Sequence, residues 1–88
     1  MKHAGSTALD RLEPILQELR KIGALKEKSR GVFYIGGQAF LHFHEHGDEV
    51  FADLRTGDDF ERLPATKVAE RADLLRKVWA LVGASRRR

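Results

Sequence analysis

The pair Gly36-Gly37 constrains the fold more than any other feature of this chain, because it separates two runs of strand-forming residues. Residues 31–35 are rich in β-branched and aromatic side chains, and residues 38–45 carry apolar side chains at every second position. Both central residues of a tight type I′ turn need a positive φ, which glycine adopts without steric cost. The sequence therefore predicts an antiparallel hairpin in the middle of the chain.

Two further stretches extend the predicted hairpin into a meander. A loop at residues 45–48 precedes a third alternating run at residues 49–55. Residues 60–63 follow a turn and end at Pro64, which suits a short fourth strand at an edge of the sheet. We predict three antiparallel strands in sequence order, with the short fourth strand as an option.

Helical patterns lie before and after the predicted sheet. In the first pattern, apolar residues recur every three or four positions, which predicts a helix that ends at Gly23. It is either capped by Asp10 or begins with Pro14 at its first position, after Glu13. A second apolar stripe near the end of the chain predicts a helix that Thr66 caps and Gly83 ends. The chain is therefore predicted to be a small α+β domain: an N-terminal helix, a three-stranded antiparallel meander and a C-terminal helix.

Composition narrows the class of protein. The 88 residues make a single domain, 1–88, in which we expect flexible ends at 1–7 and 84–88. Without cysteine the chain forms no disulfide, thiolate metal site or cysteine nucleophile. Lys and Arg number 16 against 13 Asp and Glu, and the tail Arg86, Arg87 and Arg88 accounts for the difference. No apolar segment matches a signal peptide or a membrane span, so we expect a soluble cytoplasmic protein without a membrane partner.

The predicted turns also fix which side chains share a face of the sheet. The two-residue turn pairs Phe33 with Phe40, and a four-residue loop at residues 45–48 pairs His44 with Glu49. One face is then continuously apolar, so we assign it to the core. Its members are Val32, Tyr34, Ala39, Leu41, Phe43, Val50, Ala52 and Leu54.

The opposite face of the predicted sheet is too apolar to be a plain solvent face. It carries Phe33, Ile35, Phe40 and Phe51, and a patch of this kind is expected to be covered. Three covers remain open: the broad C-terminal helix, a second subunit, or a ligand or other binding partner. Trp79 in the C-terminal helix is either a core anchor or, at a dimer seam, the leading interface residue.

A cluster of histidines gives the chain a candidate metal site. His42, His44 and Glu49 share the second face of the predicted sheet, and either His46 or Asp53 lies close enough to join them. Two imidazoles and one carboxylate suit Fe(II), Zn(II) or Mn(II). The alternative is an ordinary cross-strand hydrogen bond between His44 and Glu49.

The spacing Gly36-x5-His42-x-His44-x4-Glu49 resembles the first signature of the cupin family. The resemblance implies that His42, His44 and Glu49 are metal ligands. However, the signature's closing glycine would fall one residue before Gly57, and no second motif supplies a further histidine. Three or four strands also cannot form the double-stranded barrel of that family. We therefore assign no family from this spacing.

Basic residues suggest a third class of function, weak nucleic-acid binding. Phe33, Phe40 and Phe51 on an open sheet would form a platform on which bases stack. The same face carries Glu49 and Asp53, which disfavour a phosphate backbone. The basic cluster consists of Arg20, Lys21, Lys26, Lys28 and Arg30, with the tail Arg86, Arg87 and Arg88.

The favoured interpretation is a small non-enzymatic interaction domain. It would form a homodimer, or bind a protein partner, through the Phe33/Ile35/Phe40/Phe51 face, the helix that carries Trp79, or both. No nucleophile–base pair or phosphate-binding loop is recognisable, so no catalytic residue is assigned. A domain that binds a divalent transition metal through His42, His44 and Glu49 is the alternative, and otherwise no cofactor is expected.

Overall fold

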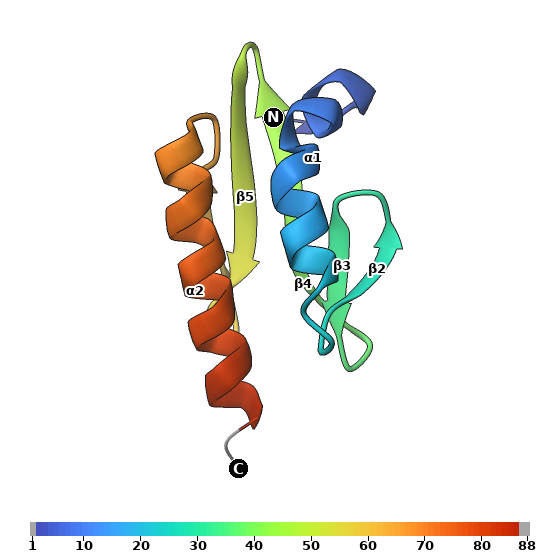
Figure 1. Ribbon diagram of the computed structural model, residues 1–88, viewed down its shortest axis with the longest axis vertical. Helices are drawn as coiled ribbons and strands as arrows, with labels where there is room; N and C mark the ends of the chain where they lie inside the picture. Colours follow the sequence, from blue (N-terminus) through green and yellow to red (C-terminus); the bar gives the residue numbers. More distant parts are fainter. Residues whose placement is uncertain (1, 87–88) are drawn as a thin grey trace.

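The computed structural model describes residues 2–86, with the side chains described as far as Gly83. Its antiparallel sheet carries both long helices on one face (Figure 1). The elements in chain order are β1 (Lys2–His3), α1 (Ser6–Arg20), β2 (Lys26–Ser29), β3 (Val32–Ile35), β4 (Gln38–His46), β5 (Glu49–Arg55), β6 (Phe60–Pro64) and α2 (Val68–Arg86).

The predicted α+β order is confirmed, and the sheet is larger than predicted. Five strands follow one another as β2-β3-β4-β5-β6, and β1 pairs with β4 beyond the end of β3. The optional fourth strand is therefore present as β6. The two additional strands, β1 and β2, have no apolar alternation, because β1 has two residues and β2 reads Lys-Glu-Lys-Ser.

The first helix starts earlier than predicted. Its N-cap is Gly5, whose backbone N–H donates to the carboxylate of Glu45 on β4. Asp10 is therefore not the capping residue; it lies inside α1 and pairs with Arg30 at 2.9 Å. The short strand β1 holds the chain next to the sheet, so the helix can begin as soon as that strand ends.

The second helix is capped by a glutamate. The Glu70 carboxylate accepts hydrogen bonds from the backbone N–H groups of Thr66 and Lys67, at 3.1 and 2.9 Å. The Thr66 hydroxyl instead accepts the backbone N–H of Val50 at 2.9 Å, so the prediction that it caps α2 is wrong. The helix also continues past Gly83. Arg87 and Arg88 of the predicted flexible tail lie outside the described residues.

A bulge changes the register between β3 and β4. Tyr34 pairs with Ala39 as predicted, but the next pair is Phe33 with Leu41, which leaves Phe40 as an extra residue. One extra residue reverses the face of every side chain beyond it. Phe33 therefore points to the helices and is 1% exposed, so its predicted place on the opposite face is wrong.

The turn between β4 and β5 is shorter than predicted. It has two residues, Gly47 and Asp48, and Gly47 has a φ of 60°. His46 therefore pairs with Glu49, and the predicted pairing of His44 with Glu49 is wrong. The error amounts to two residues, and side chains alternate with a period of two. For this reason the core residues predicted beyond the bulge on β4 and on β5 do lie in the core; they are Leu41, Phe43, Val50, Ala52 and Leu54. Val32, Tyr34 and Ala39 were also assigned to the core, but they are only partly buried and lie outside the core cluster, so that assignment is wrong.

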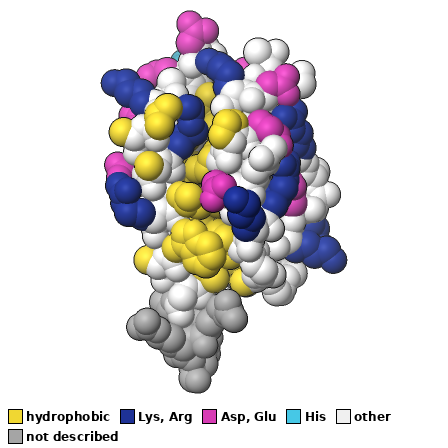
Figure 2. Space-filling model, viewed as in Figure 1, with side chains coloured by type: hydrophobic (Ala, Val, Ile, Leu, Met, Phe, Trp, Pro, Cys, Tyr) yellow, Lys and Arg dark blue, Asp and Glu magenta, His cyan; other side chains and the backbone are white. Residues whose placement is uncertain are grey.

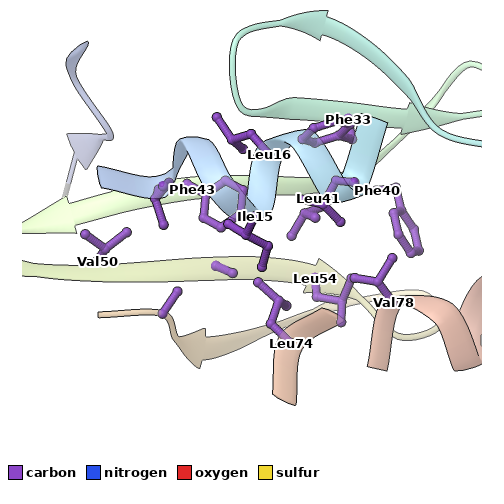
Figure 3. Close-up of a cluster of buried hydrophobic side chains, with 14 of the residues drawn as sticks. Ile15, Leu16, Phe33, Phe40, Leu41, Phe43, Val50, Leu54, Leu74 and Val78 are labelled. Atoms are coloured by element: carbon purple, nitrogen blue, oxygen red, sulfur yellow. The ribbon is translucent and has the colours of Figure 1, made fainter. Parts of the chain in front are cut away.

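The core lies between the sheet and the two helices (Figure 3). Leu12, Leu16 and Leu19 of α1 and Leu74 and Val78 of α2 are buried against the same strands. Of the three covers considered for the second face of the sheet, the C-terminal helix is therefore excluded, because neither long helix covers that face. Within residues 2–86, no helix is both long and apolar enough to span a membrane.

Candidate metal centre

Three histidines from two neighbouring strands meet on the sheet face that the helices leave open. His42 and His44 are two residues apart on β4, so their side chains share a face. His3 on β1 pairs directly with His44 across the strands. The twist and pleat of the sheet thus bring a residue near the start of the chain beside the His-x-His pair.

The imidazoles are close enough to share one ion. His3, His42 and His44 can each supply a ring nitrogen such that the three atoms lie within 4.8 Å of one another. The rings of His3 and His44 have centroids 4.8 Å apart, and those of His42 and His44 are 4.9 Å apart. His42 Nδ1 lies 2.9 Å from His44 Nε2, but that Nε2 also contacts Asp53, so while it donates to Asp53, His44 would bind an ion through Nδ1 of the same ring. Ligands at the usual zinc–nitrogen distance in a tetrahedron are about 3.3 Å apart, so the rings would have to approach one another by up to about 1.5 Å to hold one ion.

A buried carboxylate orients this cluster. Asp53 on β5 pairs with His42 in the sheet register, and its Oδ2 lies 2.9 Å from His44 Nε2. Arg62 on β6 pairs with Asp53 and holds it through two hydrogen bonds, Nε to Oδ1 at 2.8 Å and Nη2 to Oδ2 at 2.9 Å. These hydrogen bonds to Arg62 are the largest cause of a lowered Asp53 pKa, and they outweigh the burial that would raise it.

The protonation state of His42 favours metal binding. Burial lowers the pKa of His42, the neighbouring His44 lowers it further, and Asp53 opposes both effects. A lowered pKa keeps the imidazole neutral, which is the form that binds a metal ion. His44 Nδ1 is buried and has no hydrogen-bond partner in the described part of the chain. If Nε2–H donates to Asp53, this Nδ1 holds a free lone pair.

The predicted ligand set is thus only partly assembled. His42 and His44 lie together as expected, whereas Glu49 is exposed and pairs with the exposed His46. His3 was not foreseen, because a strand of two residues gives no periodic signal. Asp53, one of the two optional members named from the sequence, lies in contact with His44.

The residues predicted to form an interface do not share one surface. Phe33 and Phe40 are buried in the core, at 1% and 6% exposure, and Ile35 packs against the same cluster. Phe51 stays on the open face and is half-buried. Trp79 lies on α2, 50% exposed, on the other side of the molecule. With Phe33 and Phe40 in the core, the stacking platform proposed for nucleic acid is not formed.

Much of the predicted basic cluster is already paired with carboxylates. Arg20 contacts both Glu13 and Glu27 at 2.6 Å, and Arg30 contacts Glu13 at 2.9 Å. These contacts lower the pKa of Glu13 to about 2, because Arg20 and Arg30 both donate to its carboxylate. These arginines therefore join α1 to β2 and the adjoining turn.

Comparison with the sequence models of protein families, with curated proteins and with solved structures finds no match. The cupin-like spacing thus has no support from a family match, and the single antiparallel sheet with β-meander order is not a double-stranded barrel. The function of the histidine cluster must therefore be inferred from its own chemistry.

Proposed function

We propose that this protein is a small metal-binding domain that holds one divalent transition metal ion at His3, His42 and His44. The observation that carries the proposal is the convergence of three ring nitrogens within 4.8 Å on one sheet face. Three imidazoles are the protein ligands of the zinc ion in carbonic anhydrase, and imidazole also suits Cu(II), Ni(II) and Fe(II).

The surroundings of the three rings support the same proposal. A histidine that binds a metal generally donates its second N–H to a carboxylate or a carbonyl group, which fixes its orientation. Asp53 is placed to accept this hydrogen bond from His44, and Arg62 fixes Asp53 in turn. A buried nitrogen without a hydrogen-bond partner destabilises the folded chain, and a bound ion would remove that cost.

Isothermal titration with Zn(II) tests the proposal. We expect one ion per chain for the wild type and a large loss of affinity for His3→Ala, His42→Ala and His44→Ala. His46→Ala is the matched control, because this exposed histidine lies on the same strand and is not one of the three clustered histidines. The proposal would be refuted by a wild type that binds no ion, or by binding that the His42 and His44 substitutions leave unchanged.

Self-association through the helical face is a second candidate function. An apolar strip runs between α1 and α2 with charged side chains on both sides (Figure 2). The groove between the helices is lined partly by Ile15 and Leu75, and Val68 and Trp79 on α2 are 75% and 50% exposed. An exposed tryptophan on the helix that lines such a groove is typical of a residue that contributes strongly to an interface.

Sedimentation equilibrium tests this second candidate. We expect a concentration-dependent dimer that Trp79→Ser weakens. Because Trp79 is half-exposed, the substitution should leave the folded monomer intact, which circular dichroism would verify. A wild type that stays monomeric at high micromolar concentration would rule out self-association.

A further inference from the structure

The proposed metal centre has three protein ligands, and we infer that its remaining coordination position is open to a small anion from solution, such as a carboxylate or azide. This inference rests on the proposed metal binding and specifies the ligand class of that same site. Zinc and cobalt ions in tetrahedral sites take four ligands, so a site with three imidazoles needs one more. The group of clustered metal-binding side chains found among the described residues contains only His3, His42 and His44.

Asp53 is the nearest carboxylate, and its oxygens are already engaged. Oδ1 accepts a hydrogen bond from Arg62 Nε at 2.8 Å. Oδ2 accepts one from Arg62 Nη2 at 2.9 Å and lies 2.9 Å from His44 Nε2. To become the fourth ligand, Asp53 would have to give up charge-assisted hydrogen bonds at a position that is only 7% exposed. It therefore positions His44 and leaves the fourth position free.

The charge of the site favours an anion over a neutral molecule. The negative charge of Asp53 is balanced by Arg62, and neutral imidazoles contribute no charge. A divalent ion at this place thus keeps its full positive charge. A ligand that carries negative charge gains more from such an ion than water does, because part of the surroundings is protein of low dielectric.

The side chains around the cluster leave an accessible side. Side-chain exposure rises from 10% for Asp53 to 12% for His44 and 20% for His42, and His3 is exposed. Next to His42 lies the ring of Phe60, with centroids 5.0 Å apart, and the guanidinium carbon of Arg55 is 4.5 Å from the Phe60 ring. The apolar Phe60 ring beside His42 suits the methyl group of a small carboxylate such as acetate, whose charged end would bind the ion.

Visible spectroscopy of the Co(II)-loaded protein tests this inference, because cobalt absorption reports the ligands of the ion directly. Acetate and azide are titrated into the loaded full chain, with perchlorate at the same ionic strength as the control. We expect spectral changes that saturate at one anion per cobalt ion, and no such change with perchlorate. Asp53→Asn should respond to acetate in the same way, with an affinity for cobalt that is lower by about 10–100-fold.

Each outcome separates the inference from the proposed function. If the chain binds no cobalt, metal binding itself is wrong. If cobalt binds in a one-to-one ratio and neither acetate nor azide alters its spectrum, a protein group fills the fourth position and the inference is overturned. Asp53 would be identified as that group if two results came together. The wild type would show no response to anions, and the spectrum of cobalt-loaded Asp53→Asn without anion would differ from that of the wild type. An equal response to perchlorate would also overturn the inference.

Discussion

Replacement of Asp53 by asparagine probes the metal centre through a residue that would not touch the ion. The substitution preserves the shape of the side chain and an oxygen that can accept the His44 N–H. It removes the negative charge that holds Arg62 and would stabilise a metal-bound imidazole. Removal of a carboxylate that accepts a hydrogen bond from a metal-binding histidine typically lowers metal affinity by about 10–100-fold. We expect a loss of this size in the Zn(II) affinity of Asp53→Asn.

The same substitution should also destabilise the metal-free fold. Asp53 is 7% exposed, but the Arg62 side chain is 49% exposed, so solvent screens part of the ion pair. We therefore expect a loss of about 1 kcal/mol in the free energy of unfolding, less than the roughly 1.5–3 kcal/mol of well-buried hydrogen bonds to charged groups. For a domain of this size, that loss lowers the melting temperature by about 4–8 °C.

Titration calorimetry and thermal unfolding of the wild type, Asp53→Asn and Glu49→Gln measure both effects. Glu49→Gln is a matched control, since it makes the same chemical change at an exposed carboxylate on the same face of the sheet. It should bind Zn(II) like the wild type. If Glu49→Gln loses the metal while Asp53→Asn retains full affinity, then Glu49 is a ligand and the proposed role of Asp53 is refuted.

Three further measurements test other parts of the structure. Burial keeps the pKa of His42 below its ordinary value of 6.5, so the unfolded chain binds a proton at higher pH than the folded chain. The melting temperature of metal-free protein should therefore fall as the pH falls from about 7 to 5, and His42→Gln should flatten that fall. Gly31→Ala should cost about 1–3 kcal/mol, since Gly31 has a φ of 80° and an added Cβ would lie 2.7 Å from Leu9 Cδ2. Gly47→Ala is the control, because Gly47 also has a positive φ but an added Cβ would have no atom within 4 Å. Urea titrations of both variants should show a smaller loss of unfolding free energy for Gly47→Ala, and an equal loss would contradict the contact with Leu9. Hydrogen exchange of the Ala4 amide, which donates to Phe43 across β1 and β4, should slow when Zn(II) is added, and an unchanged rate would show that the ion does not fix β1.

The sequence predicted the order of elements well because that order depends on local signals. Gly36 and Gly37 both have positive φ, at 55° and 82°, as the predicted hairpin requires. The alternation in β4 and β5 placed Phe43 and Val50 in the core even though the predicted register was wrong by two residues. A pattern with a period of two is insensitive to such a shift.

Features that depend on contacts between distant segments could not be predicted in this way. The bulge at Phe40 leaves no mark in the pattern of apolar residues, yet it moves Phe33 into the core and removes most of the predicted interface. His3 joins the metal centre only because β1 happens to pair with β4. The site could thus be located on β4 from His42 and His44, while its third ligand needed the tertiary structure.

Anomalous X-ray diffraction at the zinc absorption edge, from crystals grown with one equivalent of Zn(II), tests the central claim most directly. We expect one strong anomalous peak per chain, about 2.0–2.1 Å from a ring nitrogen of each of His3, His42 and His44. No peak at this place, or a peak between His46 and Glu49 instead, would contradict the proposed metal centre.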